Sequence, residues 1–244
     1  MAALPPPSEK SAAVQTMFSD IAPRYDLLNH LLSLNVDKRW RRRAVDILLN
    51  GNDPSGQYLD ACAGTLDLAV EIAKRPTFSG RVIASDFALP MLLNGVHKAG
   101  GRPVHTVCAD ALRLPLPDDV CDGAIVGFGV RNLASIQDGV RELTRVLKPG
   151  GRLVILEFTT PGWQPFRAVY LTYFTRVLPL VGRLVSRHGN AYTYLPESVL
   201  QFPRPENLGG IMEAAELRDV RWQTLTGGIA AIHSGTKPLA QRPT

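Results

Sequence analysis

Tyr58-Leu59-Asp60-Ala61-Cys62-Ala63-Gly64-Thr65-Leu66-Asp67-Leu68 is the stretch of the chain that decides its fold. The apolar residues 58–61 predict a short buried strand, the small residues after them predict a turn, and residues 66–74 predict a helix. In parallel α/β sheets, the turn between a strand and the following helix is where nucleotide-like ligands bind. The stretch therefore predicts a doubly wound, Rossmann-like α/β sheet with a ligand site at this turn.

The turn suits a nucleoside without phosphates better than a dinucleotide. It lacks the G-x-G-x-x-G spacing by which a glycine-rich loop holds a pyrophosphate. Asp60 at the strand end can accept hydrogen bonds from a ligand, and Gly64 lets a ligand approach the backbone closely. S-adenosylmethionine (SAM) fits these features, so the stretch indicates a SAM-dependent methyltransferase.

Strands and helices alternate after this stretch. Apolar runs predict further strands over residues 81–87, 104–110, 121–129 and 153–158, and periodic apolar positions predict helices over residues 89–99 and 135–147. Lys148-Pro149-Gly150-Gly151 predicts a turn that ends the second of these helices. Nearly continuous apolar strands between helices predict a parallel sheet that is covered on both faces.

The flanks complete a single domain over residues 1–244. We expect an N-terminal helical cap over residues 8–50, a SAM-binding core over 57–159, a helical insertion over 160–204 that covers the substrate, and a C-terminal helix and hairpin over 205–237. The hairpin signal is Thr226-Gly227-Gly228 between two predicted strands, 220–225 and 228–233. Five parallel strands and this hairpin predict the seven-stranded sheet of a class I SAM methyltransferase.

Acidic residues end three consecutive predicted strands. Asp60, Asp86 and Asp110 would all open on the same edge of the sheet. Asp86 can accept hydrogen bonds from both ribose hydroxyls, and Asp110 or the backbone N–H of Ala111 can meet the adenine edge. Each acid has an alternative role as a helix cap or turn residue, as does Thr65 at the start of the helix. Three acids at three strand ends nevertheless favour a ligand site.

The composition agrees with one globular enzyme domain. The chain has 244 residues, 45% of them hydrophobic, and a formal net charge of +5. Cys62, Cys108 and Cys121 lie in or beside predicted strands without metal-ligand spacing, so we expect no metal. An odd cysteine count without a signal peptide or a bilayer-spanning stretch predicts a cytoplasmic protein. We expect no nucleic-acid binding, because the sequence has no helix-turn-helix, zinc module or RNA-binding signature.

Several longer strings carry a resemblance to a known family. They are Tyr25-Asp26-Leu27-Leu28-Asn29-His30-Leu31-Leu32-Ser33 followed by Trp40, Phe128-Gly129-Val130-Arg131-Asn132, Arg145–Leu153 followed by Glu157-Phe158-Thr159, Tyr192-x-Tyr194-Leu195-Pro196-Glu197-Ser198, and Thr226-Gly227-Gly228-Ile229. The turn over residues 148–151 is shared by many methyltransferases, whereas the first, second and fourth strings together are specific. From Met17 to Pro238, the chain resembles the ubiquinone/menaquinone C-methyltransferases.

The resemblance implies an activity and its reactants. SAM would be the methyl donor, and Thr65, Asp86, Asp110 and Ala111 would contact it. The acceptor would be a ring carbon of a prenylated hydroquinone, so that a demethylmenaquinol becomes a menaquinol in quinone biosynthesis. The candidates for handling this substrate are Tyr25, Asp26, Arg131, Asn132, Tyr192, Tyr194 and His233. A structural role is the alternative for His233, which lies on a predicted strand.

Two positions depart from the family pattern. The family's glycine loop G-T-G-D is Gly64-Thr65-Leu66-Asp67 here, and Gly127 stands where many members have serine. Leucine disfavours a positive φ and adds a side chain where the backbone approaches the ligand. Either Leu66 crowds the methionine end of SAM, or the loop shifts to accommodate it.

Two functional alternatives remain: a non-catalytic, methyltransferase-like scaffold in quinone biosynthesis, and a methyltransferase for another lipophilic or phenolic acceptor. The sequence is compatible with an oligomer.

Two segments have both a structural and a membrane interpretation. The basic run Lys38–Arg43 is a solvated helix face, or it attracts anionic lipid. The aromatic, arginine-rich insertion packs as core or lid, or it forms an apolar pocket for a prenyl chain. Because the expected substrate resides in the bilayer, we expect a peripheral contact with the inner face of an anionic membrane. Pro179 and Gly182 would divide the insertion into shorter helices.

Overall fold

A computed structural model of the chain describes residues 7–22, 35–177 and 190–240. These residues form a seven-stranded sheet in the order β3-β2-β1-β4-β5-β7-β6. The strands are β1 (Gln57–Ala61), β2 (Arg81–Asp86), β3 (Val104–Cys108), β4 (Cys121–Gly127), β5 (Leu147–Phe158), β6 (Arg218–Leu225) and β7 (Ala230–Thr236). Strands β1 to β5 pair in parallel, whereas β7 lies antiparallel between β5 and β6. The predicted class I sheet with its terminal hairpin is confirmed.

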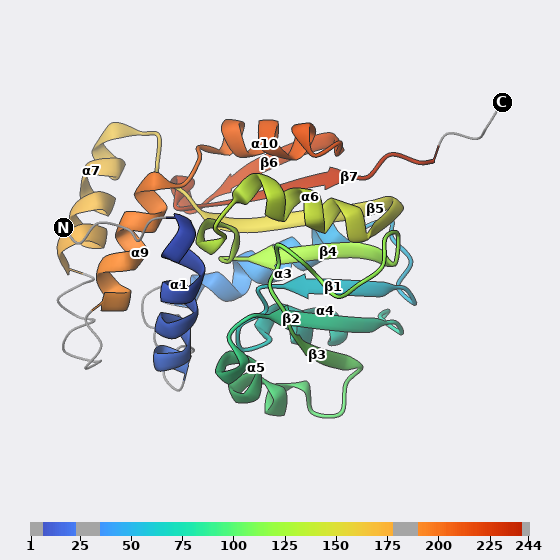
Figure 1. Cartoon of the computed structure of the whole chain (residues 1–244). Helices are drawn as coiled ribbons and strands as arrows, with labels where there is room; N and C mark the ends of the chain where they lie inside the picture. Colours follow the sequence, from blue (N-terminus) through green and yellow to red (C-terminus); the bar gives the residue numbers. More distant parts are fainter. Residues whose placement is uncertain (1–6, 23–34, 178–189, 241–244) are drawn as a thin grey trace.

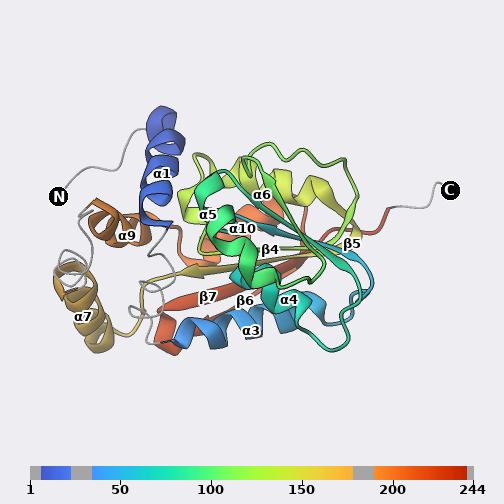
Figure 2. The same ribbon diagram turned by 90° about the horizontal axis from the view of Figure 1, so that it is seen from below.

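Helices cover both faces of this sheet and its carboxyl edge. They are α1 (Pro7–Ile21), α3 (Val36–Leu49), α4 (Asp67–Ala73), α5 (Leu89–Gly95), α6 (Ile136–Val146), α7 (Gln164–Thr172), α9 (Asn190–Gln201) and α10 (Pro205–Ala214), with short turns η2 (Val96–Ala99), η3 (Val130–Asn132), η4 (Tyr173–Val177) and η5 (Thr226–Gly228). Figure 2 shows α3 and α4 on one face and α6 and α10 on the other. The helix predicted over residues 89–99 is divided, because α5 tightens into the 3₁₀ turn η2.

The two core layers explain why the central strands are apolar throughout. In β5, Val154 and Leu156 belong to the core layer that includes residues of α3 and α4. Their neighbours Leu153 and Ile155 belong to the layer that includes residues of α6 and α10. Successive side chains of a strand point to opposite faces, so a strand with helices on both sides needs apolar residues at every position.

Strand β5 begins earlier than the sequence predicts. The predicted turn over residues 148–151 lies inside β5, where the register with β4 is interrupted between Cys121 and Gly123. The backbone of this turn is hydrogen-bonded, because Gly150 N donates to Lys237 O and Lys237 N donates to Gly151 O, each at 2.9 Å. The turn is therefore an irregularity held within the sheet rather than a break before it.

Three helices lie beyond the carboxyl ends of the parallel strands. Figure 1 shows β1 and β4 pointing toward α1 and α9, with α7 further out. Pro179 and Gly182, expected to divide the insertion, fall outside the described residues. Within the described ranges, no helix has both the length and the apolarity that crossing a bilayer requires. This edge of the sheet is where an α/β fold presents a ligand site.

Candidate functional site

A cavity opens at the carboxyl edge of the sheet. Its wall is built from the segments that follow β1, β2, β3 and β4, together with residues of α1 and α5. Gly64, Asp86, Asp110 and Ala111 line it, as the sequence analysis predicted for the ligand edge.

Asp86 ties the turn after β1 to the start of α5. Its Oδ2 accepts a hydrogen bond from Gly64 N, and its Oδ1 accepts one from Ala88 N, each at 2.8 Å. Burial raises the pKa of Asp86, and the backbone hydrogen bonds oppose that shift. Each carboxylate oxygen has two lone-pair directions, so Asp86 can hold the turn and still accept from a ligand hydroxyl. The capping and ligand-binding interpretations of this residue are therefore compatible.

Asp60 lies beneath the turn rather than in the cavity wall. Its Oδ2 accepts a hydrogen bond from Ala69 N of α4 at 2.8 Å. Within the described part of the chain, its buried Oδ1 has no hydrogen-bond partner. Burial, reinforced by Asp86 and Asp67, raises the pKa of Asp60 to about 8, whereas the Ala69 N–H and Arg41 oppose the rise. A cation close to this carboxyl would favour its ionised form.

Thr65 and Leu66 complete the turn and are both buried. Leu66 adopts a left-handed conformation with φ of 68°, and its carbonyl accepts the hydrogen bond from Val70 N that starts α4. Its side chain belongs to the core layer under α3 and α4 and is absent from the cavity wall. Leu66 therefore keeps the backbone shape expected of a glycine while directing its side chain away from the cavity.

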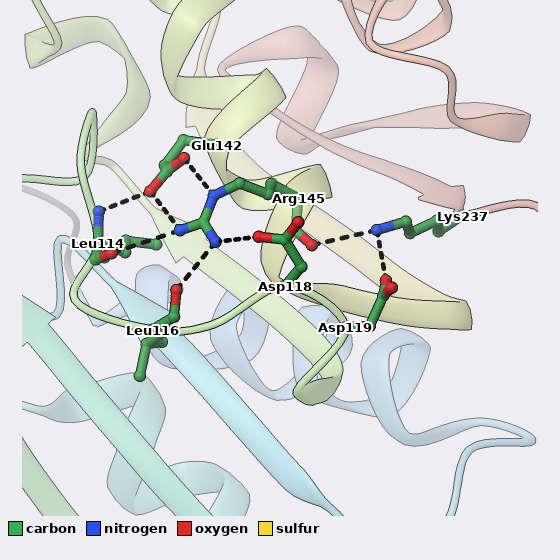
Figure 3. A network of polar contacts seen from close by, with 7 residues as sticks. All are labelled: Leu114, Leu116, Asp118, Asp119, Glu142, Arg145 and Lys237. Atoms are coloured by element: carbon green, nitrogen blue, oxygen red, sulfur yellow. Dashed lines mark hydrogen bonds and ion pairs between the residues drawn. The ribbon is translucent and has the colours of Figure 1, made fainter.

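Asp110 and Ala111 are held by the loop that joins β3 to β4. Asp110 Oδ1 accepts from Leu112 N at 2.9 Å, which is the predicted turn role. Leu114 N then donates to Glu142 of α6 at 2.7 Å. Figure 3 shows Arg145 at the centre of this anchor, with contacts to Glu142 and Asp118 and to the carbonyls of Leu114 and Leu116. The far side of the cavity wall is thus fixed to α6.

A buried ion pair lies behind the opposite wall. Arg131 Nη1 contacts Glu157 Oε1 at 2.6 Å, and both side chains are less than 10% exposed. Arg131 Nη1 also donates to Phe128 O at 2.5 Å, and Phe128 has a φ of 59°. The ion pair therefore holds the strained turn that places the Phe128 ring in the cavity wall. The sequence signal for Glu157 is an acid within a continuous apolar strand, which requires a buried partner.

Asn132 and Tyr194 meet at the same end of the cavity. Asn132 lines the cavity, and its Oδ1 accepts a hydrogen bond from the Tyr194 hydroxyl at 3.1 Å. Burial raises the pKa of Tyr194, so its hydroxyl remains a donor at neutral pH. Of the predicted substrate-handling residues, these two and Arg131 are brought together.

The remaining candidates lie elsewhere or outside the described residues. His233 is on β7, where its Nε2 lies 2.9 Å from Pro205 O and its ring stacks on Trp222. It does not line the cavity, and these contacts fit its structural alternative. Tyr25 and Asp26 fall outside the described residues, as does the side chain of Tyr192.

Helix α1 supplies residues that the sequence analysis did not place at the site. Ser11 and Phe18 line the cavity. Gln15 Nε2 donates to Phe87 O at 2.6 Å, and Lys10 Nζ donates to Arg131 O and Leu133 O at 2.9 and 2.7 Å. These contacts cross more than 70 residues of sequence, so no local pattern indicates them. Burial and the Arg131 charge lower the pKa of Lys10.

The chain is similar to known proteins over most of its length. The model of the ubiE/COQ5 methyltransferase family matches residues 7–237. The chain belongs to the ubiE/COQ5 methyltransferase family. The demethylmenaquinone methyltransferase of Thermus thermophilus is 50% identical over 224 residues, covering 91% of this chain and all of the relative. The ubiquinone/menaquinone biosynthesis C-methyltransferase UbiE of Geobacter sulfurreducens is 44% identical over 236 residues, covering 95% and 91%.

Solved structures support the fold of this ubiE/COQ5 family member. A SAM-dependent methyltransferase from Thermotoga maritima matches with a TM-score of 0.62 at 19% identity, covering 91% of this chain and 98% of the other. One from Aquifex aeolicus matches with a TM-score of 0.54 at 18% identity, covering 79% and 88%. The family and the fold together make the chain a SAM-dependent methyltransferase.

The residues at the cavity fit SAM, which has a sulfonium, an ammonium, a carboxylate and a ribose but no phosphate. Asp86 and Asp110 in the wall can accept hydrogen bonds from ribose and adenine groups. Asp60 beneath the turn has an oxygen without a partner in the described residues, and its negative charge would attract a cationic ligand without touching it. The acidic edge disfavours a phosphate-bearing nucleotide, because like charges in a buried site repel.

Proposed function

We propose that this chain transfers the methyl group of SAM to a ring carbon of a prenylated hydroquinone, demethylmenaquinol, and so produces menaquinol. The observation that carries the proposal is the identity of 50% with a relative that is named demethylmenaquinone methyltransferase and is covered over its whole length. Support from the site is the combination of an acidic edge with an aromatic and aliphatic wall that includes Phe128, Met91 and Leu133.

The cofactor half of the site would work through the acids and the turn. Asp86 would accept from the ribose hydroxyls, and Asp110 with the Ala111 N–H would meet the adenine. Asp60 would act from beneath the turn, where the positive charge of the ligand favours its ionised form without direct contact. When bound, SAM supplies an electrophilic methyl group on its sulfonium. The apolar wall excludes water, which strengthens these electrostatic contacts.

The acceptor half would use Asn132 and Tyr194. Their side chains share a hydrogen bond next to the cavity, so a quinol hydroxyl can be held by the Asn132 amide. Arg131 would act indirectly, because its pair with Glu157 and its hydrogen bond to Phe128 O hold the turn that precedes Asn132. Ring attack forms the carbon–methyl bond, breaks the sulfur–methyl bond, and ends with loss of the ring proton. Holding both reactants in one dry cavity supplies much of the rate.

The quinol would be met at a membrane surface. Trp163 and Val169 at α7 are 70% and 68% exposed. Turn η5 links this region to basic α3, because Trp40 Nε1 of α3 donates to Thr226 Oγ1 at 3.0 Å and Gly227 packs against Phe166 of α7. The exposed basic side chains of α3 are Lys38, Arg39, Arg42 and Arg43. Exposed aromatic and basic residues on two segments that are joined through η5 suit the interface of an anionic bilayer.

Incubation with labelled SAM and a demethylmenaquinol tests the proposed reaction, with mass analysis of the product. We expect one methyl group on the quinone ring and a loss of product in Asn132→Ala. SAM binding without quinol methylation would favour another lipophilic or phenolic acceptor, and simple phenols in parallel reactions identify it. Absence of SAM binding would favour the scaffold alternative.

Flotation with anionic liposomes tests the membrane contact separately. We expect partial binding that falls at high salt, because surface charges are screened over about 8 Å at physiological ionic strength. Trp163→Ser should reduce flotation, whereas Leu239→Ser should not, although Leu239 is 76% exposed. Equal flotation of the two variants, or none of the wild type at low salt, would contradict the contact.

A further inference from the structure

The basic run of α3 contains one residue that is neither solvated nor available to lipid. Arg41 is 8% exposed, whereas Lys38, Arg39, Arg42 and Arg43 are exposed. Both interpretations of the run from sequence are therefore wrong for Arg41. The helix places it on the buried face beside Trp40, and its charge is balanced by Asp37 one turn earlier, which is 2% exposed.

Arg41 reaches two segments that build the cavity. Its Nη1 lies 3.3 Å from Asp67 Oδ2, and Asp67 follows Leu66 directly at the start of α4. Its Cζ lies 5.8 Å from the centroid of the Phe128 ring, which lines the cavity from the segment after β4. A guanidinium over an aromatic face is attracted to it. One side chain of α3 thus contacts the turn after β1 and the turn after β4.

A second cation restrains Asp67 from another helix. Lys98 Nζ of η2 donates to Asp67 Oδ1 at 2.8 Å, so the two carboxylate oxygens have partners on separate elements. The two sites differ in exposure, because the Arg41 side chain is 10% exposed and that of Lys98 is 20% exposed. The Lys98 contact is the shorter of the two and the Arg41 contact is the less exposed, so each cation holds one oxygen of Asp67.

We propose that Arg41 is a positioning residue for SAM, which holds the turn after β1 and the Phe128 ring in their binding arrangement by contacting Asp67 and Phe128 together. Arg41 acts through these residues and does not line the cavity. The inference rests on the cofactor position proposed above. It concerns SAM binding alone, so it stands even if the methyl acceptor proves to be different.

Arg41 also affects the charge state beneath the turn. The charged groups that act on Asp60 come from three elements: Asp86 of β2, Asp67 of α4 and Arg41 of α3. The two acids raise the pKa of Asp60, and Arg41 lowers it. Loss of Arg41 should therefore move the pH dependence of SAM binding upward. A purely structural arginine would change stability without this shift.

Calorimetric titration of purified Arg41→Met with SAM between pH 6 and 9 tests the proposal. We expect binding about tenfold weaker, equal to about 1.4 kcal/mol, a rise in the pH midpoint, and partial rescue in Arg41→Lys. Steady-state kinetics should show a higher KM for SAM with little change in kcat. Arg141→Met, which loses an exposed pair with Asp138 on α6, is the control and should bind SAM like the wild type.

Arg41→Met also removes a partner of the buried Asp37, so this variant could fail to fold. A second variant then tests the proposal. Asp67→Asn keeps the side-chain shape and weakens the contact from the other side. We expect a similar loss of SAM affinity, and the exposed Asp138→Asn should show none. Unchanged SAM affinity in Asp67→Asn and in a folded Arg41→Met would overturn the proposal. If Asp86→Ala binds SAM more weakly in the same experiments, the proposed position of the cofactor still holds and only the role of Arg41 is refuted.

Discussion

The side chain of Leu66 packs directly against Gly95 of α5. A Cβ at position 95 would lie 2.8 Å from Leu66 Cγ and 2.5 Å from the carbonyl carbon of Thr65. Leu66 has the positive φ of a glycine, and its side chain is fully buried. The missing side chain at Gly95 therefore makes room for the extra one at Leu66, and the backbone facing the cavity keeps its path.

This pairing predicts that Leu66→Gly lowers stability without improving SAM binding. Loss of a buried leucine costs about 2–5 kcal/mol, and relief of the left-handed conformation returns about 1–2 kcal/mol. We expect the free energy of unfolding, measured by urea titration, to fall by the difference between these two terms. Leu66→Ala should be no more stable than Leu66→Gly, because alanine keeps the strained φ. Tighter SAM binding by Leu66→Gly would instead indicate that the leucine crowds the ligand.

Asp86→Ala should weaken SAM binding by about 1.5–3 kcal/mol, the usual range for hydrogen bonds to a charged group. The carboxylate also accepts from Gly64 N and Ala88 N, so the variant should melt at a lower temperature. Calorimetry with SAM measures the first effect and thermal unfolding the second. Asp138→Ala on α6 is the exposed control. Unchanged SAM affinity in Asp86→Ala would remove this residue from the site.

SAM binding should release a proton from Asp60 below about pH 8. The pKa of this buried carboxyl is raised to about 8, so it is protonated in the free protein at neutral pH. A cationic ligand favours the ionised form, and affinity should therefore rise with pH up to about 8 and then level off. Titrations in buffers of different ionisation enthalpy count the protons. Asp60→Asn should bind SAM with little pH dependence.

The same raised pKa sets the pH dependence of folding in the absence of ligand. Between about pH 4, where the unfolded carboxyl titrates, and about pH 8, the folded protein binds more protons at Asp60 than the unfolded chain does. The contribution of Asp60 to stability therefore falls as pH rises through this window. Asp60→Asn should remove that part of the slope in urea unfolding measured at several pH values.

The contribution of His233 to stability should change with pH in the opposite direction to that of Asp60, and at lower pH. Burial lowers its pKa, and the contact with Pro205 O only partly opposes this. The unfolded chain then binds more protons than the folded protein once the pH falls below about 6.5, so stability is present above that value and is lost as pH falls through the folded pKa. His233→Gln should reduce the loss of stability between pH 7.5 and 5.5. An identical pH profile in the variant would contradict the assignment.

Arg145→Met should loosen the cavity wall from outside it. Arg145 anchors the loop after β3 to α6, and the hydrogen bond from its guanidinium lowers the pKa of Glu142. We expect lower thermal stability and SAM binding weaker by about 0.5–2 kcal/mol, the usual range for mutations that act through packed neighbours. Arg141→Met, exposed on the same helix, should change neither. Arg145→Lys should not restore binding, because an ammonium cannot make the bidentate contact.

The sheet could be predicted because its signals are local. Buried parallel strands are apolar at every position, and the parallel topology brings Asp60, Asp86 and Asp110 to one edge whatever the loops do. Strand ends were predicted to within a few residues, with β5 as the main exception. Its extra residues pair with Cys121 and Lys237, which are distant in sequence.

The rest of the site depends on contacts between distant segments. Helix α1 enters the wall through Lys10 and Gln15, whose partners lie on other elements. In the sequence, Arg41 looks like part of a solvated basic face. Its burial depends on contacts such as the one with Asp67, which lies 26 positions later. Conformational preferences also disfavour a leucine at a positive φ. The space left by Gly95 accommodates the Leu66 side chain in that conformation.

The hydrogen bond between Trp40 and Thr226 has a consequence for synthesis. The two residues are 186 positions apart, so α3 leaves the ribosome long before its partner exists. Until β7 follows, the nascent chain carries an unpaired β5 edge, which can pair with another chain. Arrival of the hairpin both covers that edge and supplies the Thr226 hydroxyl. The last strands made therefore protect the edge of β5, one of the most apolar strands of the sheet.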